Sequence, residues 1–129
     1  MKTLRVGIAS YEQMKARTMA IARGELKPAA GEPKVWFRSA ESFARVLSDR
    51  NRALLAIIAE STPESLTRLA ELTGRKKSNL SRTLKTMEHY GFVKLTRGAR
   101  GSVIPRVPYQ RISLTLPLLT PAREETAAA

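Results

Sequence analysis

Residues 65–93 read SLTRLAELTGRKKSNLSRTLKTMEHYGFV, and this stretch decides the fold. Apolar side chains recur at helical spacing on both sides of Gly74. They are Leu66, Leu69, Ala70 and Leu72 before the glycine and Leu80, Leu84 and Met87 after it. The pattern predicts two helices, over about 63–73 and 76–90, which a glycine turn joins as in a helix-turn-helix. We expect Thr62 to cap the first helix ahead of Pro63, and Gly91 to end the second in the left-handed conformation.

A basic hairpin is expected directly after the second helix. Residues 92–95 (FVKL) read as one strand and residues 103–107 (VIPRV) as its return, and Pro105 confines the return strand to a sheet edge. The turn between them, TRGARGS, holds two glycines and two arginines. With the two helices, this hairpin predicts a winged helix-turn-helix.

Residues 39–60 are expected to supply the first helix of this domain. Ser39 is suited to cap it, and apolar residues follow at helical spacing. Ser48 and Asp49 either begin a fresh helix or lie in a kinked one, and the pattern leaves both readings open.

Residues 1–38 read as a strand–helix–strand extension. Alternating apolar residues predict a strand over 3–9, and residues 35–37 form a second candidate. Between them, Ser10 and Gln13 have the spacing of a capping box at the start of a helix that should stop at Gly24. Trp36 and Phe37 fit either a partner or dimer surface, or a small core of their own.

The chain after residue 107 is expected to contain one more strand. Residues 109–116 alternate, and they either complete a sheet in their own subunit or pair across a dimer. Residues 117–129 should fray. We therefore expect an α+β fold in three segments. They are an N-terminal extension for dimerisation or partner binding (1–38), a winged helix-turn-helix DNA-binding domain (39–107), and a C-terminal strand with a flexible tail (108–129).

Positive charge is concentrated where the helix-turn-helix pattern lies. The net charge is +12, and residues 65–106 hold ten lysines and arginines against two acidic residues. This distribution favours nucleic-acid binding, although a membrane surface or an acidic protein would also attract it. The chain lacks cysteine, which excludes disulfides and thiolate zinc sites, and no apolar run is long enough to span a membrane. We expect a cytoplasmic protein.

The outer face of the helix over 76–90 carries most of the candidate DNA contacts. Asn79 can pair with adenine and Arg82 with guanine, while lysines neutralise phosphates and serines donate to them. The arginines of the hairpin turn suit a narrow minor groove. The candidate contacts are Lys76, Lys77, Ser78, Asn79, Ser81, Arg82, Lys85, Arg97 and Arg100. The alternatives are a solvated basic helix and a plain surface hairpin.

Catalytic and metal chemistry have no support in the pattern. His89 is the only histidine, and no other metal ligands stand at workable spacing from it. No glycine-rich phosphate loop follows a strand. We expect no enzyme activity, no cofactor and no metal site.

Residues 66–95 (LTRLAELTGRKKSNLSRTLKTMEHYGFVKL) resemble the core of MarR-like winged-helix transcriptional regulators. The residues on that family's pattern are Leu69, Ala70, Gly74, Ser78, Leu80, Ser81, Arg82, Leu84, Met87, Glu88, Gly91, Phe92 and Val93. The resemblance implies that Ser78, Asn79, Ser81 and Arg82 face DNA and that the protein is a homodimer on palindromic sites. MarR-like proteins dimerise through long terminal helices, whereas both ends here read as short strands with one helix. Their dimer geometry is therefore not carried over.

Nearly the whole chain, from VGIASYEQMKARTMAIARGE to VPYQRISLTLPL, is also similar to small predicted prokaryotic regulators that are often encoded beside toxin-like proteins. We expect a sequence-specific regulator that binds double-stranded DNA as a homodimer and represses its own promoter. The alternative is an antitoxin, a protein-interaction module that neutralises a toxin partner and uses DNA binding for autoregulation. A third reading is a sequence-independent DNA or RNA binder.

Overall fold

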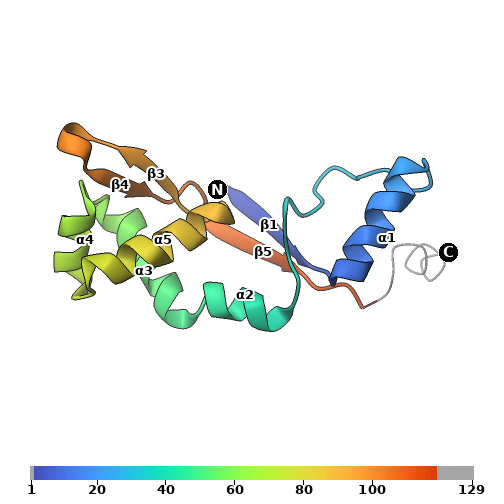
Figure 1. The fold of residues 1–129 in the computed structure, drawn as a ribbon, viewed down its shortest axis with the longest axis horizontal. Helices are drawn as coiled ribbons and strands as arrows, with labels where there is room; N and C mark the ends of the chain where they lie inside the picture. Colours follow the sequence, from blue (N-terminus) through green and yellow to red (C-terminus); the bar gives the residue numbers. More distant parts are fainter. Residues whose placement is uncertain (1, 119–129) are drawn as a thin grey trace. The chain divides into compact units, whose positions relative to one another are not determined.

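The computed structural model describes residues 2–118, so most of the tail predicted to fray (residues 119–129) lies outside the described residues. The chain is an α+β fold, as predicted (Figure 1), and divides into two compact units. Within the described residues, unit 1 comprises Lys2 and residues 44–111, and unit 2 comprises residues 3–43 and 112–118. The three-segment division stays a prediction.

Both units mix helices and strands. Unit 1 contains α3 (Asp49–Ser61), α4 (Leu66–Thr73), α5 (Lys77–His89), β3 (Lys94–Arg97), a short 3-10 turn η1 (Ala99–Gly101) and β4 (Val103–Arg106). Unit 2 contains β1 (Thr3–Ile8), α1 (Tyr11–Ala22) and β2 (Val35–Phe37). The remaining elements, α2 (Ala40–Val46) and β5 (Arg111–Thr115), each cross the division between the units.

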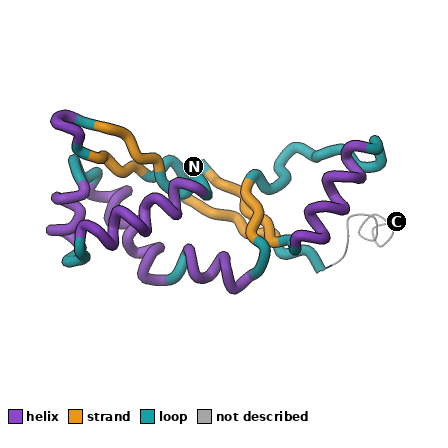
Figure 2. The backbone as a smooth tube through the Cα atoms, viewed as in Figure 1, coloured by secondary structure: helices purple, strands orange, loops and turns teal. Residues whose placement is uncertain are grey.

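The three helices α3, α4 and α5 share the core of unit 1. Its buried side chains include Leu54, Leu55, Ile58, Leu66, Leu69, Leu80, Leu84 and Met87. The antiparallel hairpin β3–β4 packs beside these helices, with β4 against α3 and α4 and β3 against α5 (Figure 2). The core therefore fixes the position of α5 relative to the hairpin.

The first hairpin strand lies later in the sequence than predicted, because of the way in which α5 ends. Gly91 adopts the predicted left-handed conformation, with φ +85°, and Phe92 N–H donates to the Met87 carbonyl at 2.9 Å. This helix ending turns Phe92 and Val93 into the core instead of into the β-ladder. The strand predicted over 92–95 is therefore β3 at Lys94–Arg97.

The predicted cap of α4 is wrong. Thr62 instead ends α3 in the left-handed conformation, with φ +42°, and Ser65 caps α4 by accepting the Arg68 N–H at 3.1 Å. The Pro63 carbonyl accepts a hydrogen bond from the Arg106 guanidinium at 2.7 Å. Pro63 therefore lies in the link before α4 and not in the first turn of the helix, and Arg106 of β4 contacts this link.

Two further helix starts follow serines. Ser39 caps α2, as predicted, by accepting the Ser42 N–H at 3.0 Å. Ser48 begins a fresh helix, α3, by accepting the Asn51 N–H at 3.2 Å. The question left open by the pattern is therefore resolved in favour of two separate helices.

Unit 2 is built on a three-stranded sheet of order β2-β1-β5, so the strand predicted over 109–116 joins a sheet of its own chain. The strands β1 and β2 are parallel, with Gly7 opposite Trp36. A Cβ atom on Gly7 would lie 2.5 Å from the Trp36 ring, so only glycine fits there. The capping box of Ser10 and Gln13 at the start of α1 is confirmed.

Candidate nucleic-acid interface

Helix α5 has one buried face and one exposed basic face. Leu80, Leu84 and Met87 are completely buried, with 0% exposure. Six of the seven candidate contacts of this segment are exposed, namely Lys76, Lys77, Ser78, Asn79, Arg82 and Lys85, and Ser81 is half-buried. The helical period thus places the side chains that pack α5 into the core on one face and the side chains that a ligand can contact on the other.

The start of α5 is electropositive. Lys76 occupies the N-cap position without a capping hydrogen bond from its side chain, and the first turn contains no acidic residue. The N-terminal end of a helix carries partial positive charge, to which Lys76 and Lys77 add. This end of α5 is therefore suited to lie against an anion.

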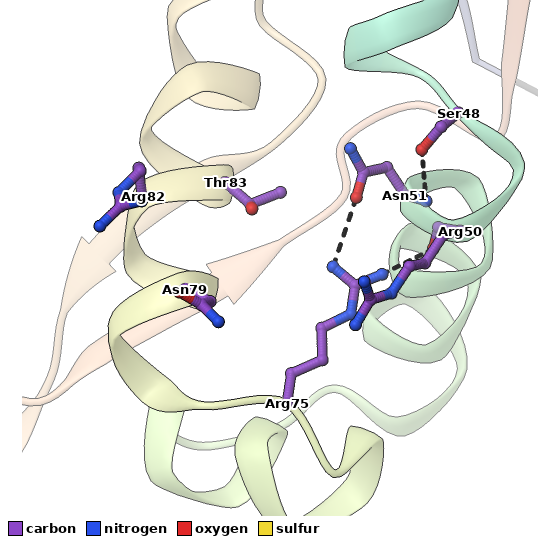
Figure 3. Close-up of a pocket in the computed structure, with 7 residues that line it drawn as sticks. All are labelled: Ser48, Arg50, Asn51, Arg75, Asn79, Arg82 and Thr83. Atoms are coloured by element: carbon purple, nitrogen blue, oxygen red, sulfur yellow. Dashed lines mark hydrogen bonds between the residues drawn. The ribbon is translucent and has the colours of Figure 1, made fainter.

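A recess of about 360 Å³ lies between α3 and α5 (Figure 3). Its lining residues are Ser48, Arg50, Asn51, Arg75, Asn79, Arg82 and Thr83. Asn79 and Thr83 point from α5 toward the side chains of α3, and Arg82 lies at the outer edge. Three of the lining residues are arginines and none is acidic. We call this cavity the arginine recess.

Arg75 is held in place within the arginine recess. Its guanidinium donates to Asn51 Oδ1 at 3.3 Å and to the Arg50 carbonyl at 2.9 Å. Asn51 in turn donates through Nδ2 to the Val46 carbonyl at 3.0 Å. Burial, and then repulsion from Arg50, lowers the pKa of Arg75 from its ordinary value. An arginine starts from so high a pKa that it remains charged at neutral pH.

A second hollow, of about 230 Å³, is lined by residues of α5 and of the hairpin, together with Leu66. Its lining residues are Leu66, Ser81, Lys85, Glu88, Leu95, Thr96, Arg97 and Val103. Glu88 accepts the Leu95 N–H at 3.2 Å and so connects α5 to β3. This connection keeps Arg97, at the end of β3, beside the basic face of the helix.

The hairpin tip is a tightly built turn. Gly98 N–H donates to the Ser102 carbonyl at 2.7 Å, and a Cβ atom on Gly98 would lie 2.6 Å from Ile104 Cδ1. Arg100 adopts the left-handed conformation with φ +58°, which costs a non-glycine residue about 1–2 kcal/mol. Its side chain is exposed at the tip.

The nine predicted contacts therefore fall into three groups. Asn79 and Arg82 line the arginine recess, and Ser81, Lys85 and Arg97 line the second hollow. The others, Lys76, Lys77, Ser78 and Arg100, line neither.

Five residues of the arginine recess were missed by the sequence-based prediction: Ser48, Arg50, Asn51, Arg75 and Thr83. Arg50 and Arg75 lie 25 positions apart, and helical periodicity carries no information on such a contact. The position of Arg75, directly after the turn glycine, was the one available signal.

Within residues 2–118, no three His, Cys, Asp or Glu side chains cluster so that they could hold a metal ion. No helix in the same part of the chain is both long enough and apolar enough to cross a membrane.

Comparison with known proteins gives one family. No curated protein and no solved structure matches the chain. A family model described as HVO_A0114 matches residues 46–114, which is over half of the chain and includes α3, α4, α5 and the hairpin. The chain therefore belongs to the HVO_A0114 family.

Proposed function

We propose that residues 39–107 form a winged helix-turn-helix that binds double-stranded DNA in a sequence-specific way. The observation that carries this proposal is α5, whose exposed face is basic and whose opposite face is fully buried. A helix held in this way, after a tight turn, can enter the major groove and present its early residues to base edges. Asn79 and Arg82 then read bases, and Lys76, Lys77 and Lys85 contact phosphates.

The surroundings of α5 support the same proposal. Basic side chains line the hollows on two sides of the helix, and the arginines of the hairpin extend the positive surface. Affinity comes mainly from phosphate contacts and specificity from Asn79, Arg82 and their neighbours. One such helix reads only a few base pairs, so we expect a homodimer on a two-fold symmetric site. We propose that this site lies in the protein's own promoter, which makes the protein an autorepressor.

Fluorescence anisotropy with two duplexes tests this function. One duplex comes from the region upstream of the protein's own coding sequence, and the other has the same composition in scrambled order. We expect tighter binding to the upstream duplex, with a preference that persists as salt rises. Equal affinity for both, with a steep salt dependence, would identify a non-specific binder. Absence of binding to either duplex would reject DNA as the ligand.

A second candidate function is protein interaction through unit 2, in its strong form as an antitoxin that neutralises a toxin. Large apolar side chains on unit 2 are exposed: Tyr11 by 66%, Met19 by 43%, Leu114 by 43% and Leu116 by 54%. Co-purification with the protein encoded next to this one, for the wild type and for Tyr11→Ser with Leu116→Asp, tests it. Loss of capture in the variant, with duplex binding retained, would favour this function.

A further inference from the structure

We propose that the arginine recess binds a phosphate group through Arg50 and Arg75. In the DNA complex, this group is a backbone phosphate next to the bases that α5 reads. The assignment of this phosphate to DNA rests on the proposed function, whereas the phosphate site itself does not.

The charge of the recess fits a phosphate. Three guanidinium groups line it, and no carboxylate does. The acidic residue next in sequence to Arg50 is Asp49, which pairs with Arg52 and does not line the recess. Within residues 2–118, the side chains of Arg50 and Arg82 make no hydrogen bond or ion pair with another side chain. They are therefore available to a ligand.

The recess is also organised before any ligand arrives. Arg75 is fixed by Asn51 and by the Arg50 carbonyl, which engage its two terminal nitrogens. A guanidinium has five N–H donors, so further donors of Arg75 remain for an oxygen ligand. Burial and the nearby charge of Arg50 destabilise the charged form of Arg75, as its lowered pKa indicates. A bound anion would offset the repulsion between the two arginines.

The chemistry of the donors favours phosphate over a single carboxylate. Each guanidinium presents parallel N–H groups in a fixed fork, and a phosphate offers oxygens in several directions to more than one fork. Thr83 adds a hydroxyl from α5. The recess is thus bounded by donors on both α3 and α5.

Binding of inorganic phosphate to the free protein tests the site without DNA. Arginine side-chain and backbone signals are followed by NMR during a titration at constant ionic strength. We expect saturable shifts at Arg50, Asn51 and Arg75 that Arg50→Gln abolishes. This variant keeps the backbone carbonyl that holds Arg75. The matched control is Arg45→Gln, which removes the same charge from an exposed position on α2 and should leave the shifts intact. Unsaturable shifts, or shifts spread over all basic residues, would overturn the proposal.

Duplex binding then distinguishes the source of the phosphate. If a DNA phosphate occupies the recess, Arg50→Gln weakens binding to upstream and scrambled duplexes alike and lowers the slope of log K against log salt by about 0.9. Inorganic phosphate then competes with the duplex. If Arg50→Gln leaves duplex binding unchanged although the wild type binds inorganic phosphate in the recess, the recess serves a free phosphate compound. Failure to bind any duplex would reject the proposed function and leave the NMR result to decide the site.

Discussion

Arg82 and Lys85 lie on the same exposed face of α5 but differ in what they can recognise. The planar guanidinium of Arg82 can donate two parallel hydrogen bonds to guanine, whereas the ammonium of Lys85 acts as a point charge. Base reading and phosphate binding are therefore separable at these two residues.

The variant Arg82→Ala should cost about 1–3 kcal/mol of binding free energy on the upstream duplex and much less on the scrambled one. Anisotropy titrations of both duplexes measure this difference. Lys85→Ala is the matched control on the same helix and should weaken both duplexes equally. An equal loss for Arg82→Ala would show that Arg82 contacts only phosphate.

Asn51 stabilises the protein through two side-chain hydrogen bonds, neither of which involves a residue of α5. Its amide joins the end of α2, at the Val46 carbonyl, to the side chain of Arg75. Because Asn51→Ala removes both hydrogen bonds, it should lower the free energy of unfolding by about 1–3 kcal/mol. Urea denaturation measures this loss. The exposed Asn79→Ala should stay within about 0.5 kcal/mol of the wild type, and a comparable loss there would contradict the assignment.

At the scale of elements, helix caps determine where α3 ends and α4 begins. The Ser65 hydroxyl accepts a backbone N–H of α4, whereas Thr62 terminates α3. Ser65→Ala should therefore cost about 1 kcal/mol of unfolding free energy. Thr62→Ala should change it by less than about 0.5 kcal/mol, because no capping bond is lost. Thermal and urea unfolding of the two variants check this, and the reverse order would restore the cap predicted from sequence.

The same elements show what sequence can predict here. Periodicity separated the faces of α5, since Leu80, Leu84 and Met87 need only their spacing to share a side. The Ser10 cap follows from residues three positions apart. Thr62 was misassigned because Thr-Pro and Ser are both helix-start signals, and the local pattern does not select between them. The arginine recess depends on the packing of α3 against the turn before α5, which no local pattern reports.

At the scale of the whole molecule, unit 2 is assembled from both ends of the chain. Its sheet places β1 between β2 and β5, although nearly all of unit 1 lies between β1 and β5 in the sequence. Removing residues 1–38 would take away the central strand and leave β5 without its neighbour. The interaction surface of unit 2 is therefore better tested by point variants than by truncation.

Self-association through unit 2 gives the last prediction. Leu114 and Leu116 are exposed on and just after β5, an edge strand of the sheet, and burial of such side chains against a second copy would stabilise a dimer. The double variant Leu114→Asp and Leu116→Asp should shift the protein toward monomer in sedimentation velocity, because four carboxylates would meet in that interface. Leu72→Asp is the matched control, since Leu72 is similarly exposed, by 39%, but lies on α4 in unit 1. Both variants should keep the helical circular dichroism of the wild type. A dimer that survives in the double variant, or that dissociates equally in the control, would place the contact between copies outside β5.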